Sequence, residues 1–541
     1  MPTKSATKKA AKKAVTKSAA KKAAPKKAAA KSTKKSAPGG HTPVRVRMYR
    51  QGLGDCFLVT FDPGGKEVHM LIDCGTLGAV TTGNKMAEIV DHIRETTGGH
   101  IHLMIATHEH QDHVSGFHTL KKEFQKMTVD HVWMAWTENP EDDLAKSLEK
   151  YKGDLGEAVG LAMQRLAKTP GEAAATAMGE AMGSLLEFAI GADGLANLGA
   201  KAGPAKTVDS GMTFVRTGQK TPKGESVKAE YHSPGGPALE PDWVPGFRFY
   251  VLGPPRDKEK LKDMGEHGSP DIYGIADSLN AGAADSDSAP AGMDEPNMPF
   301  DTRFRCKETD PRVSAFLQGS YQNADNAWRR VDTEWLYGAT DLALQLDNLT
   351  NNTSLALAIE RISDGKVLLF PADAQEGHWL SWHEPKEPFT YVQDGTTHTT
   401  TAEKLLNQTV FYKVGHHGSH NATASRKGLE MMTRQNELVA FIPVDRQVAL
   451  TRSPKGQWKM PANKLYRTLL EKAQGRVVRS DIGWADDPAN AQTAEGKEAE
   501  AAFKDTASPA EWAQWRKNQA AASVTIDPTK PKSLYIDYKL A

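Results

Sequence analysis

Three histidines and an aspartate lie within six consecutive positions of this chain, at His108, His110, Asp112 and His113. Imidazole and carboxylate groups are costly to gather away from water unless a cation shares them. In an extended backbone His108 and His110 point the same way, and the next turn brings Asp112 and His113 to a neighbouring position. The alternative is a histidine-rich surface loop, but such loops rarely follow a run as apolar as residues 101–106. The spacing therefore predicts a metal site, and one such loop could serve two ions.

This loop resembles the metallo-β-lactamase-fold hydrolases, whose signature is His-x-His-x-Asp-His after a buried strand. Other segments narrow the branch, because in their order along the chain they are similar to the hydrolase domain of bacterial competence DNA-uptake proteins and to phosphorylcholine esterase. These segments are GLGDCFLV at 52–59, LIDCG at 71–75, NNTSL at 351–355, LLFPADA at 368–374 and KVGHHGS at 413–419. Together with the loop they lie between residues 44 and 420, with long unmatched stretches inside.

The resemblance implies an α/β fold, a metallo-β-lactamase-like αββα sandwich, with metal ligands at the ends of strands. His108 and His110 would take one ion and Asp112 and His113 the other, with Asp373 as the bridging carboxylate. His416 is the expected last imidazole, and His417 is either the alternative ligand or a residue that contacts substrate. Spacing alone leaves the order of these two histidines open.

Asp73 ends a predicted strand beside the metal loop, where we expect it to orient a ligand rather than bind metal. The alternative is a simple turn residue. Many relatives supply one more histidine before the bridging aspartate, and His131 and His232 are the candidates here. The number of metal ions therefore stays open. Imidazole and carboxylate ligands favour Zn²⁺, with two ions expected, and admit Mn²⁺ or Fe.

A water that loses its proton near neutral pH on such cations would attack an electrophilic centre. Asp112 and His417 are the residues expected to act in catalysis. The resemblance implies a phosphodiester substrate, and hence a phosphodiesterase or nuclease, with Lys413, Ser419 and His420 as candidate phosphate donors. Two alternatives remain: a hydrolase of a small ester, thioester or lactam, and a non-enzymatic nucleic-acid-binding protein on the same fold.

The elements that must position these residues follow from hydrophobic periodicity. A strand over 44–48 precedes a hairpin of strands 57–61 and 68–72, and a helix near 86–93 leads to the strand before the metal loop. A helix is expected after His113, with its N-terminus at the loop. Later we expect a helix over 328–346, strands at 129–136, 247–252, 351–360, 366–370, 410–414, 438–444 and 477–480, a helix over 461–473, and a final edge strand over 533–538.

At 541 residues the chain exceeds one ordinary domain, so we expect one hydrolase unit with insertions and tails. Two apolar stripes at helical spacing predict a helical insertion, which is a lid, a partner or oligomer surface, or a packed structural elaboration. The expected division is a tail at 1–40, a first half-domain at 41–137, the insertion at 138–205, a return at 206–255, a flexible excursion at 256–330, a second half-domain at 331–485 and a polar segment at 486–541.

Charge is distributed unevenly along the chain. Residues 1–40 hold thirteen of the 68 basic residues and none of the 67 acidic ones, so the remainder is net acidic. This segment has almost no large apolar residues and is expected to be disordered. It would contact nucleic acid through phosphates, in a salt-sensitive manner. The alternatives are a solubilising tail or a misassigned start.

Composition also bears on the compartment. The cysteines Cys56, Cys74 and Cys306 form no framework of pairs, which suits a reducing cytoplasm. We expect Cys56 and Cys74 to be buried core residues. There is no run of 18 apolar residues, so no membrane-spanning segment is expected.

Overall fold

The computed structural model describes residues 41–77, 84–168, 182, 183, 185, 206–262, 310–321, 334–452, 458–487, 492–528 and 533–541. The predicted tail at 1–40 lies outside the described residues. So do Cys306, most of the second predicted insertion helix and most of the predicted excursion at 256–330. Residues His41–Ala541 form one compact unit.

The first sheet has eight strands and carries the predicted metal loop. Its order is β16-β17-β1-β2-β3-β4-β5-β6. Strands β1, β2 and β3 pair antiparallel, whereas β3, β4, β5 and β6 run parallel to their neighbours. The strands are β1 (Val44–Tyr49), β2 (Phe57–Phe61), β3 (Val68–Ile72), β4 (His100–Ile105), β5 (Thr128–Ala135), β6 (Ala229–His232), β16 (Val524–Ile526) and β17 (Tyr535–Leu540).

The second sheet has seven strands and carries the remaining candidate ligands. Its order is β15-β14-β13-β12-β9-β8-β7. An antiparallel group of three, β7, β8 and β9, is again followed by parallel strands, here β9, β12, β13 and β14. The strands are β7 (Phe247–Gly253), β8 (Ala356–Arg361), β9 (Lys366–Phe370), β12 (Thr409–Lys413), β13 (Val439–Ile442), β14 (Val477–Arg479) and β15 (Gly483–Trp484). A separate hairpin joins β10 (Phe389–Gln393) to β11 (Thr396–Thr400).

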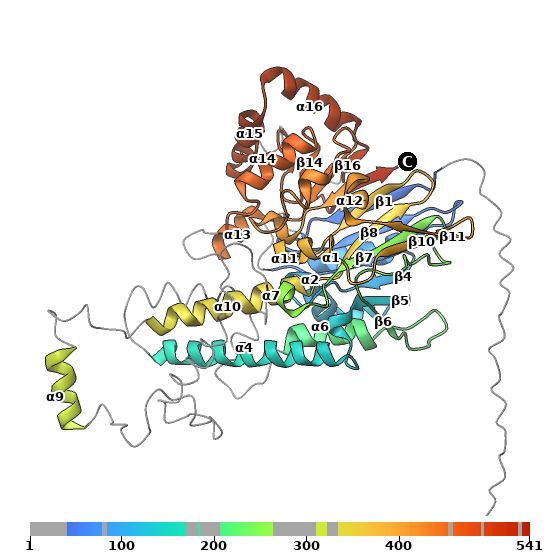
Figure 1. The fold of residues 1–541 in the computed structure, drawn as a ribbon. Helices are drawn as coiled ribbons and strands as arrows, with labels where there is room; N and C mark the ends of the chain where they lie inside the picture. The colour runs from blue at the N-terminus through green and yellow to red at the C-terminus, as the bar shows by residue number, and fades with distance from the viewer. Residues whose placement is uncertain are drawn as a thin grey trace, which may run out of the picture. The chain divides into compact units, whose positions relative to one another are not determined.

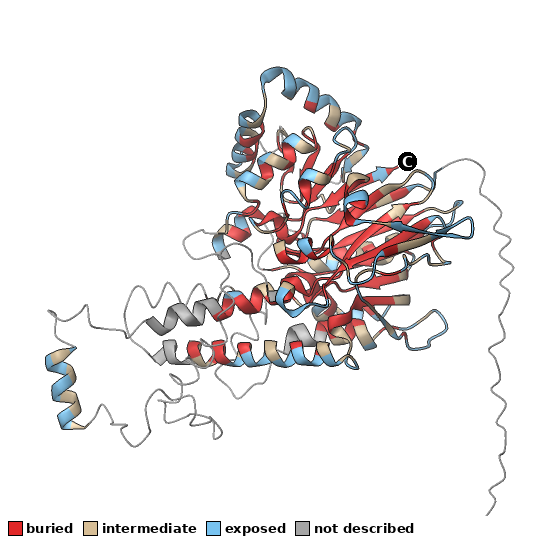
Figure 2. Cartoon of the chain, in the orientation of Figure 1, coloured by how far each residue is buried: buried red, intermediate tan, exposed pale blue. Residues whose placement is uncertain are grey.

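The two sheets share one apolar core, and helices cover their outer faces (Figure 1). Phe57 of β2 meets Phe370 of β9 with ring centroids 6.1 Å apart, and Phe61 meets Phe247 at 4.7 Å. Figure 2 shows both sets of strands as mostly buried. The described residues therefore form an α/β protein with two mixed sheets.

Helices cover the first sheet on one side and the second sheet on the other. The first set contacts a cluster that includes Ile89, Phe117 and Phe214, and the second contacts one that includes Leu406, Leu470 and Trp515. The helices are α1 (Met86–Thr96), α2 (Gln111–Thr119), α3 (Lys121–Phe124), α4 (Asp143–Lys168), α6 (Lys206–Thr217), α7 (Lys258–Lys262), α9 (Pro311–Ser320), α10 (Glu334–Asn352), α11 (Glu376–Ser381), α12 (Ala402–Asn407), α13 (Arg446–Arg452), α14 (Asn463–Lys472), α15 (Ala494–Thr506) and α16 (Pro509–Ala521). Three 3₁₀ turns are η1 (Trp136–Glu138), η5 (His416–Gly418) and η6 (Leu429–Met431).

Helices α4 and α10 pack lengthwise against each other (Figure 1). Leu148, Leu155 and Val159 of α4 are buried in one cluster with Leu342, Leu346 and Leu349 of α10. The first predicted stripe of the insertion is thus a 26-residue helix. We call α4 and α10 together the helical pair.

Several predicted elements are confirmed. The hairpin of 57–61 and 68–72 has these bounds, and its turn places Gly64 and Gly65 at φ 80° and 86°, where residues with a Cβ are strained. The strand over 366–370 is β9. The helix expected after the metal loop is α2.

Other predictions are wrong. Helix α10 continues through Asn352, and β8 begins only at Ala356, so residues 351 and 352 are helical rather than extended. The apolar spacing of Leu342, Leu346 and Leu349 against α4 explains the extra turn. Segment 492–526, read only as polar, contains α15, α16 and β16. Strand β17 lies between β16 and β1 and is not an edge.

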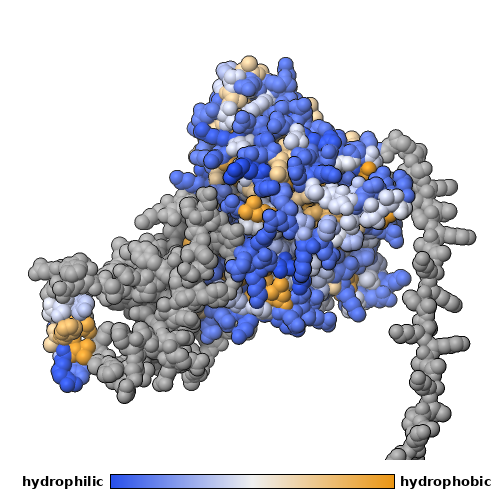
Figure 3. All heavy atoms as spheres, in the orientation of Figure 1, coloured by the Kyte–Doolittle hydropathy of each residue, from blue (hydrophilic) through white to orange (hydrophobic). Residues whose placement is uncertain are grey.

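The face of the molecule in Figure 3 is mostly hydrophilic, with apolar side chains in small, separate patches. Among the helices that the structure describes, none has both the length and the apolarity to cross a lipid bilayer.

Candidate metal centre

The metal loop joins β4 to α2. Strand β4 ends at Ile105, His108 and His110 follow in extended or irregular backbone, and α2 begins at Gln111. Asp112 and His113 therefore lie in the first turn of α2, where the positive end of the helix dipole favours a carboxylate. The two histidines, Asp112 and His113 are each at most 1 % exposed. All four side chains are therefore buried in the segment where strand β4 gives way to helix α2.

Four residues from both sheets form one buried cluster. Possible ligand atoms of Asp112, His113, Asp373 and His417 all lie within 4.8 Å of one another. His417 Nε2 is 2.6 Å from Asp112 Oδ2, and His113 Nε2 is 3.1 Å from Asp373 Oδ2. Asp373 follows β9 and His417 follows β12, so the cluster lies at the carboxyl ends of parallel strands, where α/β sheets place ligands. We call it the four-residue cluster.

His108 and His110 lie beside this cluster. The ring centroid of His108 is 4.2 Å from that of His113 and 4.8 Å from that of His110. His108 Nδ1 is 3.1 Å from the hydroxyl of Thr107, while its Nε2 is buried without a hydrogen-bond partner among the described residues. The structure therefore gathers all four loop residues, with one imidazole nitrogen left for another ligand.

His416 and His417 occupy the turn η5 with positive φ angles of 41° and 51°. Such angles cost non-glycine residues about 1–3 kcal/mol each and are concentrated at functional sites. The backbone N–H of His416 donates to Asp373 Oδ1 at 3.0 Å, and its ring Nδ1 is 3.0 Å from the hydroxyl of Ser419. The ring of His417, rather than that of His416, belongs to the four-residue cluster. A ligand role for His416 stays a prediction.

Asp73 supports the cluster from the end of β3. Its Oδ2 is 2.8 Å from His113 Nδ1 and accepts a hydrogen bond from the Thr107 hydroxyl at 2.7 Å. Its Oδ1 accepts from the Thr107 backbone N–H at 2.8 Å. These bonds fix the ring of His113 with Nε2 directed at the cluster. This is the contact by which Asp73 would orient His113 as a ligand, the role predicted for it.

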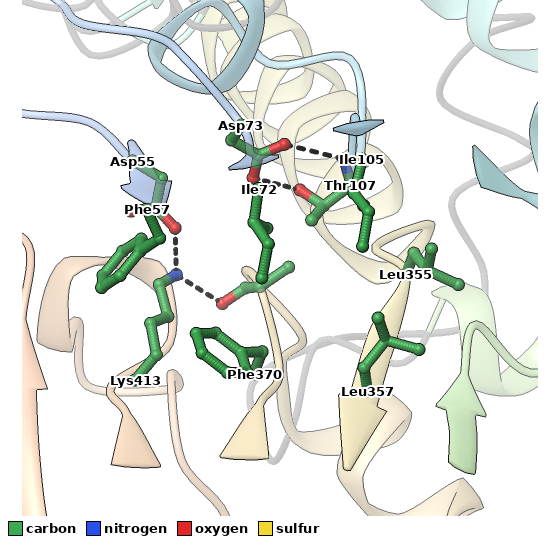
Figure 4. A pocket seen from close by; sticks show the side chains of 11 residues that line it. Asp55, Phe57, Ile72, Asp73, Ile105, Thr107, Leu355, Leu357, Phe370 and Lys413 are labelled. Carbon is green, nitrogen blue, oxygen red and sulfur yellow. Dashed lines mark hydrogen bonds and ion pairs between the residues drawn. The ribbon is translucent and has the colours of Figure 1, made fainter. Parts of the chain in front are cut away.

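A buried ion pair lies next to these residues (Figure 4). Lys413 Nζ is 2.5 Å from Asp55 Oδ2 and 3.1 Å from Asp373 Oδ1, and it donates to the carbonyl of Ala372 at 2.9 Å. The surrounding cavity is lined mainly by apolar side chains such as that of Phe370. The side chain of Lys413 is only 2 % exposed. The donors of Lys413 are thus directed to protein oxygens, and its expected role as a donor to a substrate phosphate stays a prediction.

Burial and charge together set the protonation of the cluster. Burial acts to lower the pKa of His113, but Asp373 and Asp55 raise it well above its ordinary value. Burial likewise opposes ionisation of Asp373, yet His113 and Lys413 hold the pKa of that carboxyl well below its usual range. Burial, followed by His113, lowers the pKa of His108 far below its ordinary value. The His108 imidazole is therefore neutral, as a metal ligand must be, whereas the His113 imidazole would have to release its proton when a cation binds.

The residues present fit divalent cations. Several buried carboxylates gather here. Among the described lysines, Lys413 forms ion pairs with two of them, Asp55 and Asp373. His108 Nε2 and Asp112 Oδ1 are buried without hydrogen-bond partners among the described residues. Nitrogen and oxygen donors of this kind suit Zn²⁺ and admit Mn²⁺ or Fe. The carboxylates, each at most 8 % exposed, are Asp55, Asp73, Asp112, Asp347 and Asp373.

The candidates for an additional histidine do not join this site. His131 lies 3.0 Å from Glu230, and His232 packs edge-on against Trp133 with ring centroids 4.6 Å apart. Neither belongs to the groups of possible metal ligands found among the described residues. Cys56 and Cys74 are buried, as expected.

Three supporting contacts were not predicted from the sequence. The carbonyl of Pro443 is 2.6 Å from His417 Nδ1, and Asp55 pairs with Lys413. Glu109, between the first two histidines, forms an ion pair with Lys152 of α4. The one available signal was the LGD segment before β2, which resembles the hydrolase family. It gave no indication that Asp55 pairs with a lysine.

No family model, curated protein or solved structure matches this chain.

Proposed function

We propose that this chain is a metal-dependent hydrolase of the metallo-β-lactamase type that acts on a phosphodiester. The observation that carries the proposal is the four-residue cluster with His108 and His110 beside it. The members of the cluster come from distant parts of the chain: His113 and Asp373 are 260 positions apart, and Asp112 and His417 are 305 positions apart and still meet at 2.6 Å. A chance surface group of histidines would not be fully buried.

Bound cations would supply a hydroxide near neutral pH and would stabilise negative charge that develops on substrate oxygens. The chain's own residues keep the donor atoms in place. Asp73 holds His113 at Nδ1, and the Pro443 carbonyl holds His417 at Nδ1. Both rings therefore direct Nε2 into the four-residue cluster. Asp112, which has one oxygen on His417 and one without a partner among the described residues, is placed to orient the attacking oxygen.

The sequence predicted His416 as the last imidazole ligand and His417 as the alternative ligand or a residue that contacts substrate. The positions of the two rings support the opposite assignment. His417 is fully buried within the cluster, whereas His416 is 9 % exposed. We therefore assign His417 to the metal ligands and His416 to contact with substrate. Asp373 Oδ1 is held by Lys413, whereas its Oδ2 lies near His113. The bridging role proposed for this carboxylate would therefore fall to Oδ2.

The phosphodiester as substrate is supported by the resemblance to the DNA-uptake and phosphorylcholine esterase branches. Residues 1–40 add a cationic segment suited to nucleic acid. A small ester, thioester or lactam is the second candidate. The burial of Lys413 favours it, because this lysine already balances the charge of protein carboxylates.

The test is a turnover assay with two substrates. Purified protein supplied with Zn²⁺ or Mn²⁺ is expected to hydrolyse bis(p-nitrophenyl) phosphate, and Asp112→Ala is expected to lower kcat at least about a hundredfold. Asp505→Asn is the matched control. The Asp505 side chain is 60 % exposed and pairs with Arg467, which is 47 % exposed, so this variant should retain full activity.

The outcomes separate the candidates. Full turnover by Asp112→Ala would remove the proposal. Activity on a thioester or lactam with none on phosphodiesters would decide for the second candidate. Salt-dependent nucleic-acid binding without any turnover would indicate a non-enzymatic binding protein.

A further inference from the structure

The last turns of α10 lie against the metal loop. Asp347 of α10 is 8 % exposed, and its Oδ1 is 3.7 Å from Nε2 of His110. Its other oxygen, Oδ2, accepts a hydrogen bond from the side-chain amide of Asn351 at 3.2 Å. Asn351 is one turn further along the same helix and is fully buried. The carboxylate is therefore held with one oxygen toward the imidazole of His110.

The separation between Asp347 and His110 is informative. At 3.7 Å it is too long for a hydrogen bond between an imidazole and a carboxylate. Two ligands of one tetrahedral Zn²⁺ with bonds of about 2.0–2.2 Å lie about 3.3–3.6 Å apart. The observed distance is close to this value. The geometry therefore fits two ligands that face a common cation better than it fits a directly bonded pair.

The metal loop holds other buried donor atoms. His108, whose ring is 4.8 Å from that of His110, has a buried Nε2 without a hydrogen-bond partner among the described residues. Asp112 Oδ1 is likewise buried and without a partner there. The metal loop thus holds buried donor atoms beyond those that form hydrogen bonds within the four-residue cluster.

We propose that Asp347 is a metal ligand and shares with His110 a second cation position next to the four-residue cluster. This inference rests on the proposed metal-dependent hydrolase. It accounts for the additional ligand that neither His131 nor His232 supplies. It also gives the helical pair a function, since α10 contributes a ligand to the site.

The replacement of an imidazole by a carboxylate has a chemical consequence. Oxygen ligands suit Mn²⁺ better than imidazole does, and they add a negative charge to the position. The second position is therefore expected to accept Mn²⁺ more readily than a position built from imidazoles alone.

The experiment measures metal content rather than activity. Full-length protein is stripped with a chelator, titrated with Zn²⁺ and analysed for bound metal by equilibrium dialysis and mass spectrometry. The wild type is expected to bind two ions. Asp347→Asn, which keeps the size of the side chain, and Asp347→Ala are expected to retain one ion and to lose affinity for the other by about 10- to 100-fold. Asp505→Asn, at an exposed carboxylate, is the control and should bind two.

Each result decides a separate claim. If Asp347→Asn binds two ions with unchanged affinity, or if the wild type binds one ion that the substitution does not affect, the inference is overturned while the hydrolase proposal stands. If the wild type binds no metal, the proposed function fails as well. Circular dichroism of the metal-free proteins checks that a loss of metal does not follow from unfolding.

Discussion

At the scale of single residues, the site depends on which nitrogen of each imidazole the protein occupies. His113 and His417 are bonded at Nδ1 by Asp73 and Pro443, and His108 contacts Thr107 through Nδ1. In each ring Nε2 is left to face the interior of the site. Such outer contacts set the tautomer and the orientation of a ligand before any metal arrives.

Among the described residues, one histidine outside the four-residue cluster lacks such contacts at both ring nitrogens. His378 of α11 is fully buried, and neither ring nitrogen has a hydrogen-bond partner among the described residues. Burial lowers its pKa to about 3. Because the unfolded chain binds the proton with a pKa near 6.5, stability is full above that pH and is lost as the pH falls from about 6.5 toward 3. The expected loss is about 1.4 kcal/mol per pH unit.

The measurement is urea unfolding of the metal-free protein between pH 7.5 and pH 5. His378→Leu removes the titrating group, so its free energy of unfolding should fall less steeply over this range than that of the wild type. The comparison of slopes cancels the titration of residues common to both proteins. Parallel curves would show that His378 is not buried in its neutral form.

The sequence could predict site residues that lie close together along the chain, but not those that meet only in the folded protein. The four loop residues lie within six positions, so their types and spacing alone indicated a metal site. Asp347 and Asp55 carry no local pattern, because their partners His110 and Lys413 reach them only through packing of α10 and of the two sheets. Spacing likewise could not order His416 and His417, since the positive φ angles of η5 decide where each ring points.

At the scale of elements, the helical pair is attached to the metal loop at more than one point. Lys152 of α4 forms an ion pair with Glu109, and Asp347 of α10 lies beside His110. Glu109 lies between His108 and His110, so its side-chain partner influences the backbone that carries both. The side chain of Lys152 is 12 % exposed and that of Glu109 is 30 % exposed.

Removal of this lysine should therefore destabilise the protein. Lys152→Met leaves the Glu109 carboxylate largely out of water without its partner, and we expect a loss of about 1–3 kcal/mol in the free energy of unfolding. Lys146→Met is the control on the same helix, because Lys146 pairs with Asp143, whose side chain is 98 % exposed. That variant should change stability by less than about 0.5 kcal/mol.

The two variants are compared by chemical denaturation, together with Glu109→Gln and the double variant Lys152→Met/Glu109→Gln. A double-mutant cycle then isolates the energy of the pair. Strict additivity would mean that the ion pair contributes nothing and that the helical pair is held by its apolar contacts alone.

Elements with strong periodicity were predicted well, and those defined by tertiary contacts were not. The β2–β3 hairpin and β9 have the predicted bounds because alternating or continuous apolar runs end at clear turn residues. Helix α16 has a capping box between Ser508 and Glu511 with Pro509 at its start. This signal was present in the sequence, but a polar composition without a long apolar stripe obscured the helix.

At the scale of the whole molecule, each sheet repeats the same arrangement of an antiparallel group followed by parallel strands. The site forms where the parallel strands of both sheets end, so neither sheet holds it alone. The relation between the sheets could not be predicted from strand patterns, because both faces of each sheet are apolar. Strand β17 also joins β1, and Arg47 of β1 is 2.7 Å from Asp537 of β17.

This buried ion pair should contribute strongly to stability. The side chains of Arg47 and Asp537 are 7 % and 8 % exposed, so Asp537→Ala leaves an unpaired buried guanidinium. We expect a loss of about 3–5 kcal/mol in the free energy of unfolding, measured by chemical denaturation. Glu67→Ala is the control, because Glu67 pairs with Arg45 of the same strand at a site where the side chains are 47 % and 25 % exposed. A similar loss in both variants would refute the expectation.

The pairing of β17 with β1 also bears on how the chain folds as it is synthesised. Every candidate ligand has left the ribosome well before Tyr535–Leu540 is made, yet until then β1 lacks its neighbour on that side. Until Tyr535–Leu540 is made, the nascent protein thus carries an unpaired strand edge, the kind of surface that recruits other chains. Chaperones that cover such edges would be of greatest use to this protein during translation rather than afterwards.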